Sequence, residues 1–462
     1  MRSSIFALAL CVPPAFGQLP AATQTAVDQS AIKILADTGV PSASVAIVKD
    51  GKIAYVHAYG DARLDPKTPA LPRMRYKIAS NSKQIAATAI LLLAEEGQIS
   101  LDDPVSRFLP ALTRAGEVTI RELLSHTSGY EDYYPLDYVA PFMTGATTPP
   151  HILDVWAKKP LDFDPGTEWQ YSNTNYVIIG QIIEKLTGKP LIDFLRARIF
   201  SPLGMHSPVD IGRDPWSDED PAGYTTYALG PAREIPPEGT GWLYAAGELG
   251  MTAGDLALWD ISLMNGTVLK PAFLRELTTE VRLKNGIGTH YALGLEVSTS
   301  GGHRRWAHSG GAAGFVSMNV TFPDDKISVT VLTNGEDGAA SRIERDIEGR
   351  MLAPMEDPRT APALENAKKI FAGLQKGNLE RDLITGDLAS YFTPRALEDF
   401  ASSLGPLGAP SSFTQSASEE RGGMTYRSYR VRLTSKSVGI STYVTHDGKF
   451  AQFLISPAAN GQ

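Results

Sequence analysis

One stretch of this chain must lie inside a folded domain. From Ile85 to Ala94 nearly every residue is apolar, and the helix pattern that contains this run extends from Ser80 to Glu96 and stops at Gly97. A helix that is apolar on all sides is stable only when other elements enclose it. Its first turn nevertheless carries Lys83, a residue type that is rarely buried without a partner, so the lysine needs a reason to be there.

The buried helix stands between two regions of strand-like sequence. Strand patterns at 43–48 and 53–59 are joined by Asp50-Gly51, a dipeptide typical of hairpin turns. Other helices are predicted at 23–37, 119–125, 173–187, 254–264 and 339–351, and further strands at 291–297, 303–307, 315–322 and 327–333. Because strands lie at both ends of this region, they must share a sheet on which the apolar helix packs. The sequence therefore predicts an α+β domain.

The length of 462 residues predicts more than one domain, because a single hydrophobic core stops growing at roughly 250–300 residues. We expect a main domain at 23–353, a linker at Pro354–Pro362 and a small C-terminal α+β domain at 362–462. In the small domain, helical patterns at 363–374, 379–390 and 394–404 precede strand-like runs at 412–418, 424–434, 438–445 and 449–455. It contains no chemical motif, so the sequence predicts no role for it.

The first 17 residues have the pattern of a secretory signal peptide. Arg2 supplies a positive charge, Ile5–Val12 is apolar, and small residues follow at Ala15 and Gly17. We therefore expect removal of residues 1–17 and an exported protein, periplasmic or secreted. The apolar run is too short to span a bilayer and no later run is long enough, so no integral membrane segment is expected after processing. The only cysteine, Cys11, lies within this signal.

Composition and motifs exclude several functional classes. The net charge is −8 with no basic run, so nucleic-acid binding is not expected. The eight histidines are scattered, and the nearest pair, His303 and His308, are five residues apart, which on a strand places them on opposite faces. The sequence has neither a His-Glu-x-x-His nor a Gly-x-Ser-x-Gly motif. We therefore expect no metal and no other cofactor.

A candidate nucleophile stands at the head of the buried helix. In Ser80-Asn81-Ser82-Lys83 the spacing of three places the hydroxyl and the amine on one helix face. Free lysine has a pKa of about 10.4, and burial lowers it, which leaves a neutral amine able to accept the serine proton. The N–H of Ser80, at the helix start, is available to a developing oxyanion. The same spacing at Ser30–Lys33 is interpreted as an ordinary amphipathic helix.

Two further motifs offer partners for this serine. In Tyr171-Ser172-Asn173, at a loop-to-helix entry, Tyr171 can relay a proton, and Asn173 is suited to a substrate amide or to capping the helix. His308-Ser309-Gly310-Gly311 follows a predicted strand, where glycines let a substrate lie against the strand edge and a free N–H completes an oxyanion hole. His126 is a weaker candidate for the base.

The three motifs, in this order, resemble the family of class C β-lactamases, DD-peptidases and serine esterases. The resemblance covers roughly residues 40–351 and includes three supporting segments, Leu123–Gly129 (LLSHTSG), Thr252–Leu258 (TAGDLAL) and Tyr291–Leu295 (YALGL). It implies an antiparallel sheet flanked by helices, with an inserted helical subdomain, and an active site between the two.

The resemblance also implies a role for each motif residue. Ser80 becomes the nucleophile of an acyl-enzyme mechanism, and the first proton acceptor is either Lys83 or Tyr171. The substrate, a small molecule or peptide, is contacted by Asn173, His308, Ser309 and Gly310. The oxyanion hole consists of the backbone N–H groups of Ser80 and Gly311.

One position departs from the family pattern. In the β-lactamases the third motif usually begins with lysine, a permanent cation for a substrate carboxylate, whereas His308 is mostly neutral at pH 7. Esterases and D-amino-acid peptidases of the family often have histidine here. We therefore expect a serine hydrolase of small esters or D-amino-acid amides and peptides, with at most weak β-lactam hydrolysis. The alternative is a slow-turnover protein that binds penicillin or cell-wall peptide.

Overall fold

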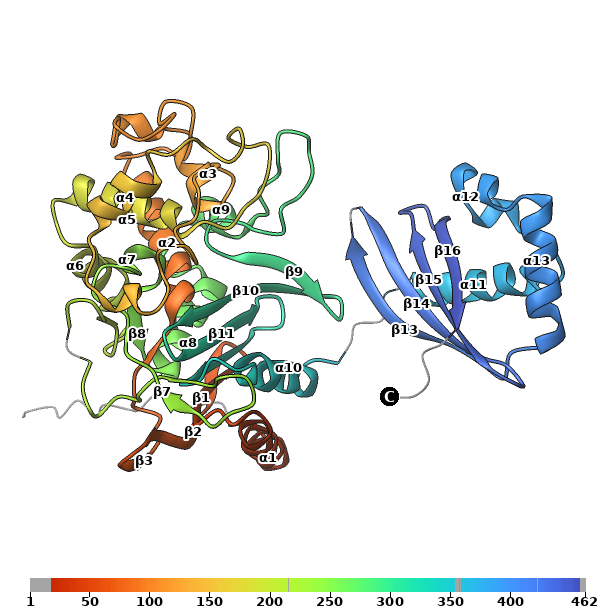
Figure 1. Ribbon diagram of the computed structural model, residues 1–462, viewed down its shortest axis with the longest axis horizontal. Helices are drawn as coiled ribbons and strands as arrows, with labels where there is room; N and C mark the ends of the chain where they lie inside the picture. Colours follow the sequence, from red (N-terminus) through yellow and green to blue (C-terminus); the bar gives the residue numbers. More distant parts are fainter. Residues whose placement is uncertain (1–17, 215, 354–356, 358, 422, 458–462) are drawn as a thin grey trace, which may run out of the picture. The chain divides into compact units, whose positions relative to one another are not determined.

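The computed structural model describes residues 18–457 except 215, 354–356, 358 and 422, and the predicted signal peptide at 1–17 lies outside the described residues. The chain divides between Ala353 and Pro354 into two compact units, each with its own hydrophobic core (Figure 1). The first helix of the second unit begins at Thr360, inside the segment expected to be a linker. No helix in the described part of the chain has the length and apolarity needed to cross a bilayer.

A seven-stranded antiparallel sheet forms the centre of the first unit, with the strand order β3-β2-β1-β12-β11-β10-β9. β1 pairs with β2 in the predicted hairpin and with β12 from Ala43↔Thr333 to Val48↔Ser328, which joins the two ends of the domain. The strands are β1 (Ser42–Lys49), β2 (Lys52–Leu64), β3 (Lys67–Pro69), β9 (Glu296–Ser300), β10 (His303–Ala312), β11 (Phe315–Phe322) and β12 (Ile327–Thr333).

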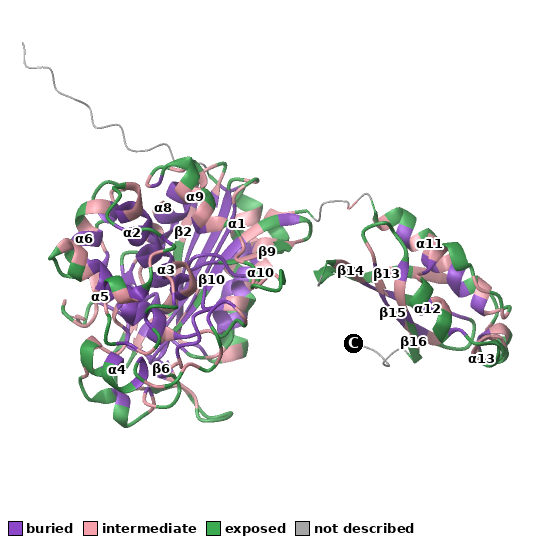
Figure 2. Ribbon diagram, turned by 90° about the horizontal axis from the view of Figure 1, so that it is seen from above, coloured by how far each residue is buried: buried purple, intermediate pink, exposed green. Residues whose placement is uncertain are grey.

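Helices cover both faces of this sheet, which is why β1 and β12 are buried along almost their whole length (Figure 2). α1 and α10 pack on one face, and α8 packs on the other, beneath the helical subdomain that contains α2 and α5. The helices are α1 (Ala21–Thr38), α2 (Ser82–Glu95), α3 (Ile120–Leu124), α4 (Pro149–Trp156), α5 (Asn173–Thr187), α6 (Leu191–Leu195), α7 (Tyr244–Gly247), α8 (Ala253–Asn265), α9 (Pro271–Thr278) and α10 (Ala339–Met351). The sequence did not predict α4, α6, α7 and α9.

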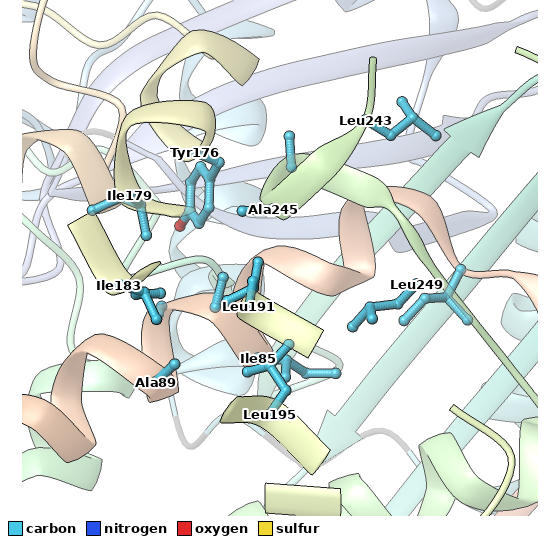
Figure 3. Packing of buried hydrophobic residues seen from close by; sticks show 14 of the residues in the cluster. Ile85, Ala89, Tyr176, Ile179, Ile183, Leu191, Leu195, Leu243, Ala245 and Leu249 are labelled. Carbon is cyan, nitrogen blue, oxygen red and sulfur yellow. The ribbon is translucent and has the colours of Figure 1, made fainter. Parts of the chain in front are cut away.

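The central helix α2 is enclosed as its composition predicts. Twelve residues in a row, from Ser82 to Leu93, are buried. Side chains of α5, α6 and α7 surround it, and in Figure 3 Ile85 lies among Leu191, Leu195 and Leu249. Burying one such aliphatic side chain stabilises the fold by about 1.5–3 kcal/mol, so this helix is held firmly in place. A group at its N-terminal end is therefore held rigidly as well.

Three expectations about local structure were wrong. The helix does not begin at Ser80: a 3₁₀ turn, Ala79–Asn81, precedes α2. Residues 291–295 do not form a strand, because Gly294 adopts φ +78° and lies so close to α2 that a Cβ there would be 2.8 Å from the carbonyl oxygen of Lys83. β10 does not end before the third motif but runs through it to Ala312, since its turn is made by residues 313–314.

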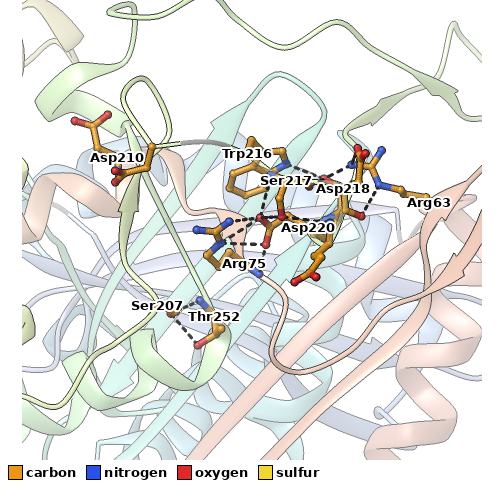
Figure 4. A network of polar contacts seen from close by, with 12 residues as sticks. Arg63, Arg75, Ser207, Asp210, Trp216, Ser217, Asp218, Asp220 and Thr252 are labelled. Carbon is orange, nitrogen blue, oxygen red and sulfur yellow. Dashed lines mark hydrogen bonds and ion pairs between the residues drawn. The ribbon is translucent and has the colours of Figure 1, made fainter.

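The segment 210–237, which is rich in Pro, Gly and Asp, is anchored to the domain. The strands among its described residues are short: β5 (Val209–Asp210), β6 (Tyr224–Thr225) and β7 (Arg233–Glu234). β5 pairs with β8 (Leu249–Met251), which pairs on its other side with β4 (Tyr76–Lys77). The buried carboxylate of Asp220 accepts hydrogen bonds from Arg75 and Ser217 (Figure 4). Trp216 packs edge-on against Phe315, 5.8 Å between ring centroids. The segment 210–237 thus supports the start of β11.

The second unit is a four-stranded antiparallel sheet with helices packed on it, as predicted for an α+β domain. Its strand order follows the sequence, β13-β14-β15-β16. α11 provides most of the helical side of the core through Ala367, Ile370, Phe371 and Leu374. The elements are α11 (Thr360–Leu374), α12 (Gly386–Tyr391), α13 (Pro394–Leu404), β13 (Ser412–Arg421), β14 (Met424–Arg432), β15 (Ser437–Val444) and β16 (Phe450–Pro457).

Candidate active site

The turn that carries Ser80 is strained and tightly packed. Ala79 has φ +48°, a left-handed conformation that costs an alanine roughly 1–2 kcal/mol. Such strain persists only where the surroundings impose it. Here β10 does so: a Cβ added at Gly310 would lie 2.2 Å from the carbonyl oxygen of Ile78 and 3.1 Å from the Cβ of Ala79. Gly310, for which a substrate contact is expected, also lets the strand approach the turn that holds the serine.

The amine of Lys83, which is fully buried, contacts three oxygen atoms. Nζ lies 2.9 Å from Ser80 Oγ, 2.8 Å from Asn173 Oδ1 and 2.7 Å from the carbonyl oxygen of Ala246. A neutral amine has two N–H groups and one lone pair. Because the oxygens of Asn173 and Ala246 can only accept, they take both N–H groups, and the lone pair is left facing the Ser80 hydroxyl. This geometry suits Lys83 to accept the serine proton.

The electrostatics of the pocket agree with that role. Burial lowers the pKa of Lys83 to about 7, and the carboxylate of Asp132 acts in the opposite direction by favouring the ammonium form. The rings of Tyr171 and Tyr176 lie 4.9 and 5.4 Å from Nζ. A pKa near 7 leaves much of the amine unprotonated at neutral pH, which is the state a general base needs.

Asp132, which the sequence analysis did not single out, orients Asn173. Its carboxylate accepts hydrogen bonds from the backbone N–H of Asn173 at 3.0 Å and from the side-chain amide at 3.2 Å. The amide is thereby fixed with its oxygen toward Lys83. Ser172, not Asn173, is the residue before the helix, so the expected capping role of Asn173 is not what the structure shows. Burial raises the pKa of Asp132, and the N–H groups of Tyr134 and Asn173 lower it.

Tyr171 lies against Ser80, and its ring packs at a tilt against the ring of a histidine. Burial raises the pKa of its phenol well above the usual range, whereas a hydrogen bond with Ser80 lowers it. The phenol is therefore protonated at neutral pH, which favours a proton relay over a phenolate base. The ring of His126 lies 4.3 Å from that of Tyr171, and its Nδ1 accepts the N–H of Ser172 at 3.2 Å. His126 positions the tyrosine and does not reach Ser80 by any hydrogen bond among the described residues.

The edge of β10 offers the second oxyanion donor. β9 pairs with β10 only as far as Ala307, so no described strand covers the edge beyond it. Ala312 and Phe315 close a two-residue turn, and hydrogen-bonded and non-bonded pairs alternate along an antiparallel ladder. Gly311 falls on a non-bonded position, which directs its N–H away from β11, toward the open edge. A Cβ added at Gly311 would meet nothing within 4 Å.

His308 is buried and neutral. Its Nδ1 lies 2.5 Å from the carbonyl oxygen of Ser309 and must donate to it, so Nε2, at 2.9 Å, accepts the hydroxyl of Tyr291. Burial, together with the smaller effect of the nearby Lys83, lowers the pKa of His308 to about 3. At position 308, therefore, this chain presents no cation. Ser309, by contrast, is exposed and faces the cleft.

These groups line one cleft of about 760 Å³, which contains Ser80, Tyr171, Asn173, His308, Ser309 and Gly311. One wall is apolar, formed by Tyr134, Tyr138, Val139, Met143, Ile235, Leu243, Phe315 and Val316. Three carboxylates also line the cleft: Asp132, Glu296 and Glu336. Among the described residues no three His, Cys, Asp or Glu side chains come together as a metal site. The arrangement can transfer an acyl group to a serine with protein groups alone.

Comparison with known proteins identifies the family that the three sequence motifs resemble. The Beta-lactamase family model matches residues 27–352. The Penicillin-binding protein 4* of Bacillus subtilis (strain 168) is 30% identical over 308 residues, 64% of this chain and 68% of that protein. A D-aminopeptidase of Brucella anthropi is 29% identical over 308 residues, which cover 65% of this chain and only 57% of the relative.

Solved structures agree with the fold. The D-stereospecific amidohydrolase from Streptomyces sp. superposes with a TM-score of 0.60 at 29% identity, covering 72% of this chain and 99% of that one. The D-amino acid amidase from Ochrobactrum anthropi SV3 complexed with D-phenylalanine reaches a TM-score of 0.65 at 24% identity, covering 71% and 99%. The fold, the site and the family match together show that this chain belongs to the Beta-lactamase family of serine hydrolases.

Proposed function

We propose that the protein hydrolyses amides and short peptides of D-amino acids through an acyl-Ser80 intermediate. The observation that carries this proposal is that Lys83 Nζ lies within hydrogen-bonding distance of Ser80 Oγ, Asn173 Oδ1 and the carbonyl oxygen of Ala246. In the neutral amine the last two oxygens take both N–H groups, which leaves the lone pair for the Ser80 proton. The names of the relatives, D-aminopeptidase and D-stereospecific amidohydrolase, support the substrate class.

In acylation, Ser80 Oγ attacks the amide carbon while its proton passes to Lys83 Nζ. The carbonyl oxygen becomes an oxyanion between the N–H groups of Ser80 and Gly311, where a missing donor costs roughly 10²–10³ in rate. The proton then moves from the lysine ammonium through the Tyr171 hydroxyl to the leaving nitrogen. The C–N bond breaks, and a free amine or ammonia departs.

Deacylation uses the same groups in the opposite order. With the leaving amine gone, a water molecule occupies its place beside Tyr171. Lys83, again neutral, removes a proton from this water through Tyr171, and the hydroxide adds to the ester carbon. The C–Oγ bond then breaks, Ser80 recovers its proton, and the D-amino acid is released.

The lining of the cleft supports the choice of substrate. The apolar wall, with Tyr138, Leu243 and Phe315 among its members, is suited to an aromatic or large aliphatic side chain. Asp132 and Glu336 add negative charge, which favours a substrate with a free amino group. A free carboxylate, as in β-lactams, finds no cation at His308.

The direct test combines labelling and turnover. A fluorophosphonate probe is expected to label the protein at Ser80 and not to label Ser80→Ala. D-phenylalaninamide is expected to be hydrolysed at least tenfold faster, in kcat/KM, than its L enantiomer or a chromogenic cephalosporin. A burst of one acylation per enzyme without turnover would favour the slow-turnover binding protein instead. Labelling of Ser80→Ala would place the nucleophile elsewhere.

We also propose that the protein is exported. The support is the sequence pattern of residues 1–17, a positive n-region, an apolar run and small residues at the predicted cleavage site. Expression of the full chain with its N-terminus, followed by N-terminal sequencing of the product, is expected to give a mature protein that begins at Gln18. An intact Met1 in a cytoplasmic product would contradict export.

A further inference from the structure

Glu296 is a carboxylate in the cleft that the acyl-transfer mechanism leaves unused. It is the first residue of β9 and pairs with Ala307, the neighbour of His308, at the point where the covered edge of β10 becomes free. Its side chain is exposed to solvent and lines the same cleft as Ser80, Tyr171 and Ser309. It therefore faces the space next to the reacting atoms.

The other two carboxylates of the cleft are engaged. Asp132 accepts the N–H groups of Asn173, and Glu336 accepts the backbone N–H of Gly314 at 3.1 Å and the hydroxyl of Thr225 at 2.6 Å. The Glu296 carboxylate, in contrast, makes no hydrogen bond and no ion pair within 4 Å with the described residues. Burial raises the pKa of Glu296, and Arg305 lowers it from beyond ion-pair distance, being itself 4.0 Å from Glu348. The Glu296 carboxylate is thus free to interact with a bound molecule.

No Lys or Arg is among the described residues that line the cleft. Nδ1 of His308 donates to the carbonyl oxygen of Ser309, and Nε2 accepts the hydroxyl of Tyr291, so the ring is neutral. Glu296 and Tyr171 line the same cleft, and Glu296 is among the charges that act on the Tyr171 phenol. The ring of Tyr171 lies 6.1 Å from that of His308. Since Tyr171 delivers the proton to the leaving nitrogen, the group that departs from the acyl carbon must lie on this side.

We propose that Glu296 selects the leaving group: it disfavours substrates whose leaving group carries a carboxylate and favours neutral or cationic ones, such as ammonia, simple amines and amidated peptides. The physical cause is repulsion between two like charges in a partly enclosed cleft, which is worth about tenfold or more in relative rate. The proposal deepens the proposed function and rests on the acyl-Ser80 mechanism, but not on the D-amino-acid acyl group.

The test uses two esters that differ only in the leaving group, 4-nitrophenyl acetate and 3-carboxy-4-nitrophenyl acetate. Their kcat/KM ratio is measured for the full-length protein, for Glu296→Gln and for Asp324→Asn. The last variant removes the same charge from a remote surface turn, where Asp324 pairs with Arg304. We expect Glu296→Gln to raise the relative rate of the carboxylated ester about tenfold, and Asp324→Asn to keep the wild-type ratio.

An unchanged ratio in Glu296→Gln would overturn the proposal, and so would an equal change in Asp324→Asn, which would assign the effect to overall charge. The wild-type discrimination is also expected to shrink as salt is raised. If the proposed D-amino-acid substrate class is wrong, the enzyme will hydrolyse the two esters but not D-phenylalaninamide. That result is distinguishable from a failure of the Glu296 proposal.

Discussion

The Nζ of Lys83 and the Oγ of Ser80 lie 2.9 Å apart at the N-terminal end of α2, a helix in which the twelve residues from Ser82 to Leu93 are buried. The lysine cannot move away from the serine without leaving the oxygens of Asn173 and Ala246 unpaired. A buried acceptor without a donor costs about 1–3 kcal/mol, so the catalytic contact is part of the packing of the domain. Reactivity and stability therefore depend on the same atoms.

The first prediction concerns pH. Because burial lowers the pKa of Lys83 to about 7, kcat/KM for 4-nitrophenyl acetate should fall about tenfold per pH unit below that value and level off above pH 8. The sign follows from the lysine: its protonated form cannot accept the serine proton. His308, with its pKa lowered to about 3, adds no limb between pH 5 and 9. A rate that is flat across this range would contradict Lys83 as the base.

The second prediction is that Asp132→Asn shifts this acidic limb, the fall of kcat/KM with decreasing pH, to lower pH. The carboxylate of Asp132 raises the pKa of Lys83, so its loss should lower the limb by about one pH unit. The asparagine oxygen can still accept the N–H of Asn173, so the amide keeps its place and kcat/KM at pH 8 should drop by less than about tenfold. Asp324→Asn is the matched control for net charge. A limb that stays in place would show that Asp132 does not act on the lysine.

Much of this site follows from the sequence because its parts are local. Ser80 and Lys83 are linked by helical spacing, and Tyr171 and Asn173 stand beside the start of a helix whose bounds, 173–187, were predicted correctly. The apolar run at 85–94 sufficed to identify the central helix, and strand patterns at both ends of the domain sufficed to predict the sheet beneath it. The third motif was found, although the strand that carries it was predicted too short, because its glycines resemble a turn when tertiary contacts are unknown.

The residues that sequence reasoning missed act across long separations. Asp132 meets Asn173 forty-one positions later, and the carbonyl of Ala246 reaches Lys83 from 163 positions away. A backbone carbonyl has no signature in a sequence. For Asp132 the only signal was a carboxylate shortly after the Leu123–Gly129 segment. Gly294 similarly looks like part of a strand until the approach of α2 is known.

The third prediction concerns a buried ion pair that ties the 231–243 segment to the sheet. Lys77 Nζ lies 2.9 Å from the Glu238 carboxylate, and both side chains are only about 5% exposed. Lys77→Met leaves the Glu238 carboxylate buried without a cation, and should destabilise the first unit by about 3–5 kcal/mol. Lys77→Met/Glu238→Met should recover a large part of that loss, because no charge remains buried. Urea unfolding measures both, and equal losses in the two variants would show that packing, not charge, holds this contact.

The fourth prediction tests whether β10 holds the nucleophile in position. Gly310→Ala places a Cβ 2.2 Å from the carbonyl oxygen of Ile78 and 2.4 Å from Ser317 Oγ, so the turn that carries Ser80 must move. Since a displacement of about 1 Å can cost roughly 10²-fold in rate, fluorophosphonate labelling of Ser80 should slow by that order. Gly349→Ala is the matched control, because a Cβ on that helical glycine of α10 meets nothing within 4 Å, and it should keep the wild-type labelling rate. Thermal unfolding of both variants separates a displaced nucleophile from general loss of structure. If Gly310→Ala keeps the wild-type labelling rate, the turn does not depend on the close approach of β10.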